Sequence, residues 1–142
     1  MKLTYFTKTE QAILGYLFDN PNIRINTRTL SEKIAFSHTS VRKSLDILEN
    51  KGLVIQKKTK LQTEAYLNLD ERRTIIEKRL YNIRILYESG LIEHIEDLYE
   101  MPECIVVFGS FSKGEDNEKS DIDIAIKTSL EERKIELAGY EE

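Results

Sequence analysis

Two aspartates separated by a single residue are the clearest candidates for chemistry in this sequence. Asp121 and Asp123 lie in the segment DIDIAI, whose strict alternation of charged or small with aliphatic residues predicts a β-strand over 121–126. Side chains two apart in a strand leave the same face, so both carboxylates project together while Ile122, Ile124 and Ile126 enter a core. Adjacent carboxylates repel each other unless a hard cation, Mg²⁺ or Mn²⁺, lies between them. We therefore predict that Asp121 and Asp123 are metal ligands and catalytic residues.

A glycine–serine pair upstream supplies a second part of the same predicted site. The apolar run over 104–108 predicts a strand buried on both faces, and it ends at Gly109 and Ser110. Gly109 permits close approach of the backbone, and Ser110 begins a short helical turn whose N–H groups and hydroxyl can hold phosphate. Lys113 and Ser120 are further candidate nucleotide contacts. A phosphate cradle beside metal-binding carboxylates predicts metal-assisted phosphoryl or nucleotidyl transfer.

The order of these features, an apolar strand, Gly-Ser, ten residues and then Asp-x-Asp, resembles the nucleotidyltransferase superfamily of DNA polymerase beta over about residues 99–130. The resemblance implies attack of a hydroxyl on the α-phosphate of an NTP, with two Mg²⁺ ions bound and pyrophosphate leaving. The family uses a third carboxylate on a later strand, whereas 19 residues follow Asp123 and predict a helix over 129–138 that contains Glu136. We expect a truncated domain; a degenerate domain and a site completed by another chain are the alternatives.

The first half of the chain carries the opposite charge from the second. Residues 1–69 contain 11 Lys and Arg against 6 Asp and Glu, whereas residues 70–142 contain 10 against 19. Because the field of each half favours different partners, this division predicts two functional parts.

The basic half has the element order of a winged helix-turn-helix. A helix over 8–19 stops at a proline, a short helix over 27–35 follows, and a longer helix over 38–51 starts after the N-cap Ser37 and ends at Gly52. Two short strands, 53–55 and 65–67, then flank a basic hairpin tip over 57–60.

Residues 27–58, TRTLSEKIAFSHTSVRKSLDILENKGLVIQKK, resemble the DNA-binding segment of bacterial and archaeal winged-helix transcription regulators, and the resemblance extends over about 5–69. It implies a helix that enters the major groove of double-stranded DNA and a wing that contacts the backbone. We assign the groove face to Thr39, Ser40, Arg42 and Lys43, and the backbone contacts to Lys57, Lys58, Lys60 and Arg28. The alternative is a winged helix that contacts proteins instead.

The connector between the halves contains an apolar stripe. Residues 70–88 predict a helix with Ile76, Leu80, Ile83 and Tyr87 at spacings of 4, 3 and 4, and residues 91–100 predict a second helix. The stripe fits either a pairing seam or packing against the flanking domains. Winged-helix regulators often dimerise through a helix in this position, so the resemblance implies a homodimer.

Composition excludes several other classes. No apolar run approaches the ~20 residues that span a bilayer, and the N-terminus lacks the apolar segment of a secretory signal. Cys104 is the only cysteine, which excludes an intrachain disulfide and a Cys-rich zinc site. We expect a cytoplasmic prokaryotic protein without membrane contact.

The sequence thus predicts an α+β protein with three parts: a winged-helix DNA-binding domain over 1–69, a helical connector over 70–100 and an incomplete nucleotidyltransferase-like α/β domain over 101–142. The predicted function is that of a DNA-binding transcriptional regulator carrying a nucleotidyltransferase-like domain. The alternatives are a Mg²⁺-dependent enzyme that transfers NMP from an NTP to a protein, an RNA or a small molecule, and the antitoxin of a toxin–antitoxin pair, which would have a protein partner.

Overall fold

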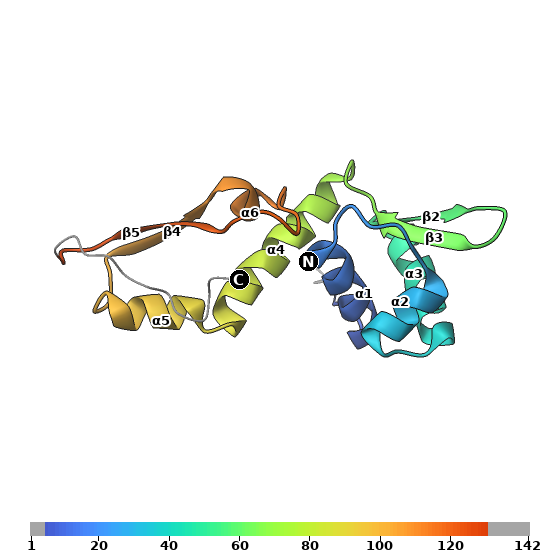
Figure 1. Ribbon diagram of the computed structural model, residues 1–142, viewed down its shortest axis with the longest axis horizontal. Coiled ribbons are helices and arrows are strands. Elements are labelled where there is room, and N and C mark those ends of the chain that lie inside the picture. The colour runs from blue at the N-terminus through green and yellow to red at the C-terminus, as the bar shows by residue number, and fades with distance from the viewer. Residues whose placement is uncertain (1–4, 131–142) are drawn as a thin grey trace.

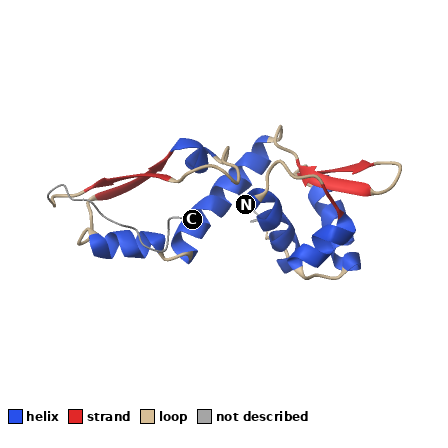
Figure 2. Cartoon of the chain, viewed as in Figure 1, coloured by secondary structure: helices blue, strands red, loops and turns tan. Residues whose placement is uncertain are grey.

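The computed structural model describes residues 5–130, which form two lobes on either side of a long helix, α4 (Figure 1). Each lobe contains one small antiparallel sheet (Figure 2). None of the described helices combines the length and apolar character needed to cross a bilayer. The elements, in chain order, are α1 (Lys8–Asp19), β1 (Ile25–Asn26), α2 (Thr27–Ile34), α3 (His38–Asn50), β2 (Val54–Lys58), β3 (Thr63–Leu67), α4 (Arg72–Glu88), α5 (Leu91–Leu98), β4 (Cys104–Phe108), α6 (Gly109–Lys113) and β5 (Asp123–Lys127).

The N-terminal lobe is a winged helix-turn-helix, as predicted. Helices α1, α2 and α3 pack on one another and on a sheet of strand order β1-β3-β2. The stripe Val41, Leu45 and Leu48 of α3 is fully buried, which confirms its predicted inward face. The rest of this core consists of Ile13, Leu14, Leu17, Phe18, Ile25, Leu30, Leu53, Val54, Ala65 and Leu67.

Local signals set the ends of α3. The Ser37 hydroxyl accepts a hydrogen bond from the Ser40 N–H at 3.2 Å, so the predicted N-cap is confirmed. Gly52 has a φ of +78°, a conformation that glycine adopts without a Cβ penalty, and it turns the chain from α3 into β2. The two-residue strand β1, which pairs Ile25 with Ala65, was too short to be predicted from periodicity.

The wing is longer than the sequence suggested. Strands β2 and β3 pair from Val54 opposite Leu67 to Lys58 opposite Thr63. The predicted tip over 57–60 is therefore partly wrong, because Lys57 and Lys58 belong to β2. The turn itself is closed by Thr59, whose N–H and hydroxyl both donate to the Gln62 carbonyl, at 2.7 and 2.8 Å.

Helix α4 buries a polar stripe and exposes an apolar one. Thr74, Lys78 and Asn82 are between 0% and 3% exposed. The predicted seam faces outward, with Ile76 42%, Leu80 58%, Ile83 47% and Tyr87 67% exposed. Packing of this seam against the flanking domains is therefore contradicted for the described residues.

Two sets of polar contacts attach α4 to the lobes. The buried Lys78 ammonium forms an ion pair with Asp116 at 2.5 Å, and Asn82 donates to the same carboxylate at 2.7 Å and to the Phe111 carbonyl at 2.9 Å. On the other side, the Tyr81 hydroxyl donates to Asp19 at 2.9 Å. Helix α4 thus forms polar contacts with both lobes.

The C-terminal lobe is a two-stranded sheet covered on one face. Its core consists of Leu86, Leu91, Ile92, Ile95 and Phe111, with Ile105, Val107, Ile124 and Ile126 packed against it. Val106 and Phe108, on the opposite face, are 47% and 49% exposed. The prediction that 104–108 is buried on both faces is wrong for the described residues, because no described element covers that second face.

The last described strand also starts later than expected. Strand β5 begins at Asp123, so Asp121 and Ile122 precede it. Ile122 is 41% exposed, which corrects the prediction that it enters the core. The predicted helix over 129–138, with Glu136, lies largely outside the described residues.

Candidate functional site

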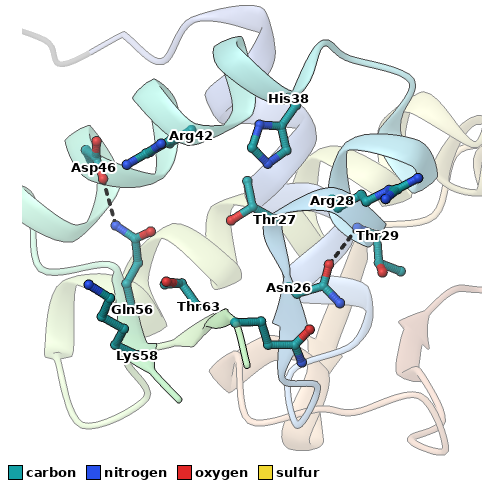
Figure 3. Close-up of a pocket in the computed structure, with 11 residues that line it drawn as sticks. Asn26, Thr27, Arg28, Thr29, His38, Arg42, Asp46, Gln56, Lys58 and Thr63 are labelled. Atoms are coloured by element: carbon teal, nitrogen blue, oxygen red, sulfur yellow. Dashed lines mark hydrogen bonds between the residues drawn. The ribbon is translucent and has the colours of Figure 1, made fainter. Parts of the chain in front are cut away.

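A cleft of about 700 Å³ lies between the start of α2, helix α3 and the wing. Figure 3 shows its side chains converging from these elements, with α3 above strand β2. The lining residues are Asn26, Thr27, Arg28, Thr29, His38, Arg42, Asp46, Gln56, Lys58, Gln62 and Thr63. All of the lining residues are polar or charged, which suits a hydrated, charged ligand more than an apolar one.

Cations outnumber anions in this lining. Arg28, Arg42 and Lys58 are exposed, and Asp46 is the one carboxylate among the lining residues. The Arg28 guanidinium forms an exposed ion pair with Glu32, one turn further along α2, at 3.3 Å. Because exposed pairs of this kind contribute little energy, Arg28 can exchange Glu32 for another anion at small cost.

The structure separates the predicted DNA contacts into groups. Arg28, Arg42 and Lys58 come together in the cleft, while Thr39 and Lys43 are exposed on α3 outside its lining. Lys60 lies in the exposed turn of the wing.

Two of these residues point elsewhere. The Ser40 hydroxyl lies 3.0 Å from that of Thr9 on α1, so Ser40 faces α1 and its place on the groove face is corrected. Lys57 lies opposite Glu64 in the hairpin, and strand alternation puts it on the other face of the wing from Lys58.

Sequence reasoning missed the contact between α3 and the wing. The Gln56 side-chain amide donates to Asp46 at 2.9 Å and to Glu49 at 3.0 Å, and the Gln56 N–H donates to Glu49 at 2.8 Å. The acidic pair, three residues apart, was visible in the sequence. Gln56 carried no signal, because its position depends on the register of the hairpin.

The second candidate site lies where β4 passes into α6. Strand pairing places Phe108 opposite Asp123, and Gly109 has a φ of +72°. A Cβ on Gly109 would lie 2.1 Å from an Asp123 carboxylate oxygen, so only glycine fits here without a shift. The structure thus brings Gly109 and Asp123 into direct contact.

The other predicted residues of this site are spread over α6 and the loop that precedes β5. Asp121 is exposed and precedes the strand, Ser110 is half-buried in the first turn of α6, and Lys113 lies at the other end of that helix. The Ser120 hydroxyl accepts from the Asn117 N–H at 3.0 Å and closes a turn. Ser120 therefore shapes the loop between α6 and β5.

The donor set fits a divalent cation in part. Asp121 and Asp123 offer the hard oxygen ligands that Mg²⁺ prefers. Within residues 5–130, no group of three or more His, Cys, Asp or Glu side chains could hold a metal ion. The described residues thus supply two carboxylates and no third.

Comparison with family models matches residues 91–141 to the family described as polymerase beta, nucleotidyltransferase. The match contains α5, β4, α6 and β5, and it leaves the N-terminal lobe unmatched. No curated protein matches the chain.

Comparison with solved structures finds similar folds over about two thirds of this chain. Two structures of Lactococcus lactis ZitR, each of a different mutant, match with TM-scores of 0.51 and 0.52, identities of 14% and 15%, and 70% and 68% of this chain covered. The match spans 66% and 64% of the ZitR chains, slightly under two thirds. The Staphylococcus aureus MepR-DNA complex matches with a TM-score of 0.47, 14% identity, and 67% and 80% of the two chains covered. The ZitR likeness shows a shared fold.

Proposed function

We propose that this protein is a DNA-binding regulator whose N-terminal lobe holds double-stranded DNA in the cleft between α3 and the wing. The observation that carries the proposal is the convergence of Arg28, Arg42 and Lys58 on that cleft. A helix fits the major groove of B-form DNA, and a wing beside it reaches the sugar–phosphate backbone.

The residues divide by the part of DNA they would contact. Arg42 and Thr39, in the first half of α3, would approach base edges, with Lys43 beside them. Arg28, Lys58 and Lys60 would bind phosphates, which fixes the position of the protein without reading sequence. Lys57, on the other face of the wing, would contribute less.

The test is a fluorescence-anisotropy titration of mixed-sequence duplex DNA at low and moderate salt. We expect affinity to fall steeply with salt, because each phosphate contact releases counterions. Arg42→Ala with Lys58→Ala should weaken binding about tenfold or more. Lys127→Ala, which removes a cation from the other lobe, is the control for loss of charge. Absence of binding at low salt would refute the proposal.

We also propose that the protein forms a homodimer through the exposed seam of α4. Ile76, Leu80, Ile83 and Tyr87 repeat at 4-3-4 spacing, which is the spacing of a coiled-coil seam. In an antiparallel pairing, Glu77 beside the seam would meet the partner's Arg84, and the reverse pair would form by symmetry. A parallel pairing would instead bring Arg84 near the partner's Arg79.

Sedimentation equilibrium tests the dimer. Leu80→Glu places a charge in the centre of the seam and should produce monomers, whereas Arg72→Glu at the first residue of α4 should not. A monomeric wild-type protein at all concentrations would contradict this assembly.

A second candidate function is Mg²⁺-dependent transfer of NMP from an NTP to a protein, an RNA or a small molecule. The contact between Gly109 and the Asp123 carboxylate favours it, together with the family match over residues 91–141. Asp121 and Asp123 would hold the ion, and Gly109 and Ser110 would face the phosphates. A bound Mg²⁺ supplies Lewis-acid stabilisation of phosphoryl oxygens.

Calorimetry with Mg²⁺ and NTP tests this second function. Asp121→Asn should abolish Mg²⁺-dependent nucleotide binding and leave DNA binding unchanged, since Asp121 lies in the other lobe from the cleft. Equal nucleotide binding by the variant would refute the metal assignment.

A further inference from the structure

We propose that Arg42 and Asp46 form a base-reading pair that selects a guanine close to a cytosine in the bound DNA. This inference rests on the proposed DNA binding, and it names the sequence feature that the cleft would recognise.

The two side chains lie one helical turn apart on the same side of α3. Both line the cleft and both are exposed (Figure 3). Across residues 5–130, no ion pair is found that engages the Arg42 guanidinium, including with Asp46. Arg42 therefore keeps its donors available to a ligand.

The Asp46 carboxylate is held in place by the wing. Gln56 donates to Asp46 Oδ1 at 2.9 Å, and the same amide is held by Glu49 at 3.0 Å. No hydrogen bond to the second oxygen, Oδ2, is found among the described residues, so one acceptor remains available to a ligand in the cleft. This positioning distinguishes Asp46 from an unsupported surface carboxylate.

Each group matches one base in the major groove. Guanine presents two acceptors, O6 and N7, which a guanidinium can bind together, whereas cytosine presents the N4 amino donor that a carboxylate accepts. A carboxylate is repelled by the acceptors of guanine and thymine. Arg42 and Asp46 thus favour guanine and cytosine, respectively.

The spacing limits where the two bases lie. One turn of α-helix rises about 5.4 Å, and successive base pairs are about 3.4 Å apart, so the guanine and the cytosine should lie within about two base-pair steps. The Asp46 charge also repels the phosphates of any duplex, and only a duplex with the cytosine offsets this repulsion through its N4 amino group. The charge therefore increases discrimination between sequences.

The experiment selects bound duplexes from a randomised pool and then measures affinities for single-base variants of the winner. We expect a guanine and a cytosine within two steps. Asp46→Ala should reduce the preference for that cytosine about fivefold or more, while it increases affinity for random duplex. Arg42→Ala should reduce the preference for the guanine alone.

Asp70→Ala is the matched control, because it removes an equal charge from an exposed position, and Asp70 neither lines the cleft nor contacts Gln56. It should keep the cytosine preference. If Asp46→Ala and Asp70→Ala behave alike, or if the selected site lacks the two bases, the base-reading pair is refuted while DNA binding stands. If no duplex binds at all, the proposed function itself fails.

Discussion

The two lobes differ in how completely they cover their sheets. In the N-terminal lobe, three helices and three strands enclose a core whose members, such as Leu45 and Val54, are at most 6% exposed. In the C-terminal lobe, β4 and β5 are covered on one face, and Val106 and Phe108 stand on the open one. Two-stranded sheets have little stability by themselves. The comparison teaches that the N-terminal lobe builds its buried core from its own helices and strands, whereas the core of the described second lobe includes residues of α4 and α5.

The largest expected effect tests that dependence. Lys78→Ala leaves Asp116 in a largely buried position without its cation, which should cost about 3–5 kcal/mol of stability. Lys127→Ala breaks an exposed ion pair with Glu103 and should cost less than about 1 kcal/mol. Urea unfolding of both variants measures the difference. Equal losses of stability would show that the ion pair between Lys78 and Asp116 does not stabilise the second lobe.

Core substitutions compare the two sheets directly. Leu45→Ala removes a fully buried side chain of the first lobe and should cost about 2–5 kcal/mol. Val106→Ala, on the open sheet face, should cost well under half as much, because that side chain already contacts solvent. Thermal or urea unfolding gives both values. A large loss from Val106→Ala would mean that its face is covered in solution.

A glycine substitution sharpens the contrast between the two sites. Gly109→Ala places a Cβ on a residue with a φ of +72° and against the Asp123 carboxylate. It should therefore lower the stability of the second lobe by about 1–3 kcal/mol and displace that carboxylate. DNA binding by the other lobe should be unchanged, whereas Mg²⁺-dependent nucleotide binding should be lost. Calorimetry and anisotropy on one preparation separate the two results; loss of both activities would contradict independent sites.

The smallest effect concerns the junction of α1 with α4. Burial raises the pKa of Asp19 above 3.8, although the hydrogen bond from Tyr81 partly opposes this shift, and burial likewise raises the pKa of Tyr81. The folded protein therefore binds a proton at Asp19 more tightly than the unfolded chain does. The ionised carboxylate thus lowers stability increasingly as the pH rises from 3.8 through the folded pKa.

Asp19→Asn removes this titration while it keeps an acceptor for Tyr81. The stability of the variant relative to wild type should rise as the pH increases above about 3.8 and should level off once Asp19 is fully ionised in the folded wild-type protein. Urea unfolding at several pH values checks the slope. A difference that is constant with pH would contradict the raised pKa.

Local signals predicted much of this fold. The bounds of α1 and β4, the N-cap Ser37 and the buried face of α3 followed from periodicity and from capping residues, which depend on neighbours in sequence. The start of β5 and the exposure of Ile122 did not follow, because alternation indicates a strand without showing where its partner ends. The predicted domain boundaries remain predictions.

For the candidate sites, too, the sequence identified residues and the tertiary structure decided where they lie. The sequence identified Arg42 as a residue of the groove face, Lys58 as a contact to the DNA backbone, and Gly109 and Asp123 as parts of a phosphate and metal site. The strand registers decided where these side chains lie. The pairing of β2 with β3 placed Lys58 in the cleft and Lys57 on the other face of the wing. The pairing of β4 with β5 placed the Asp123 carboxylate against Gly109.

Helix α4 shows most clearly what each level decides. The sequence by itself determined a helix with one apolar stripe at 4-3-4 spacing, because periodicity depends only on residue order. Only the tertiary structure decided that this stripe faces outward and that Thr74, Lys78 and Asn82 are buried instead. The physical reason, for Lys78 and Asn82, is that Asp116 and the Phe111 carbonyl, both distant in the sequence, bind their buried polar groups. The Thr74 hydroxyl has no hydrogen-bond partner among the described residues, so these contacts do not explain its burial.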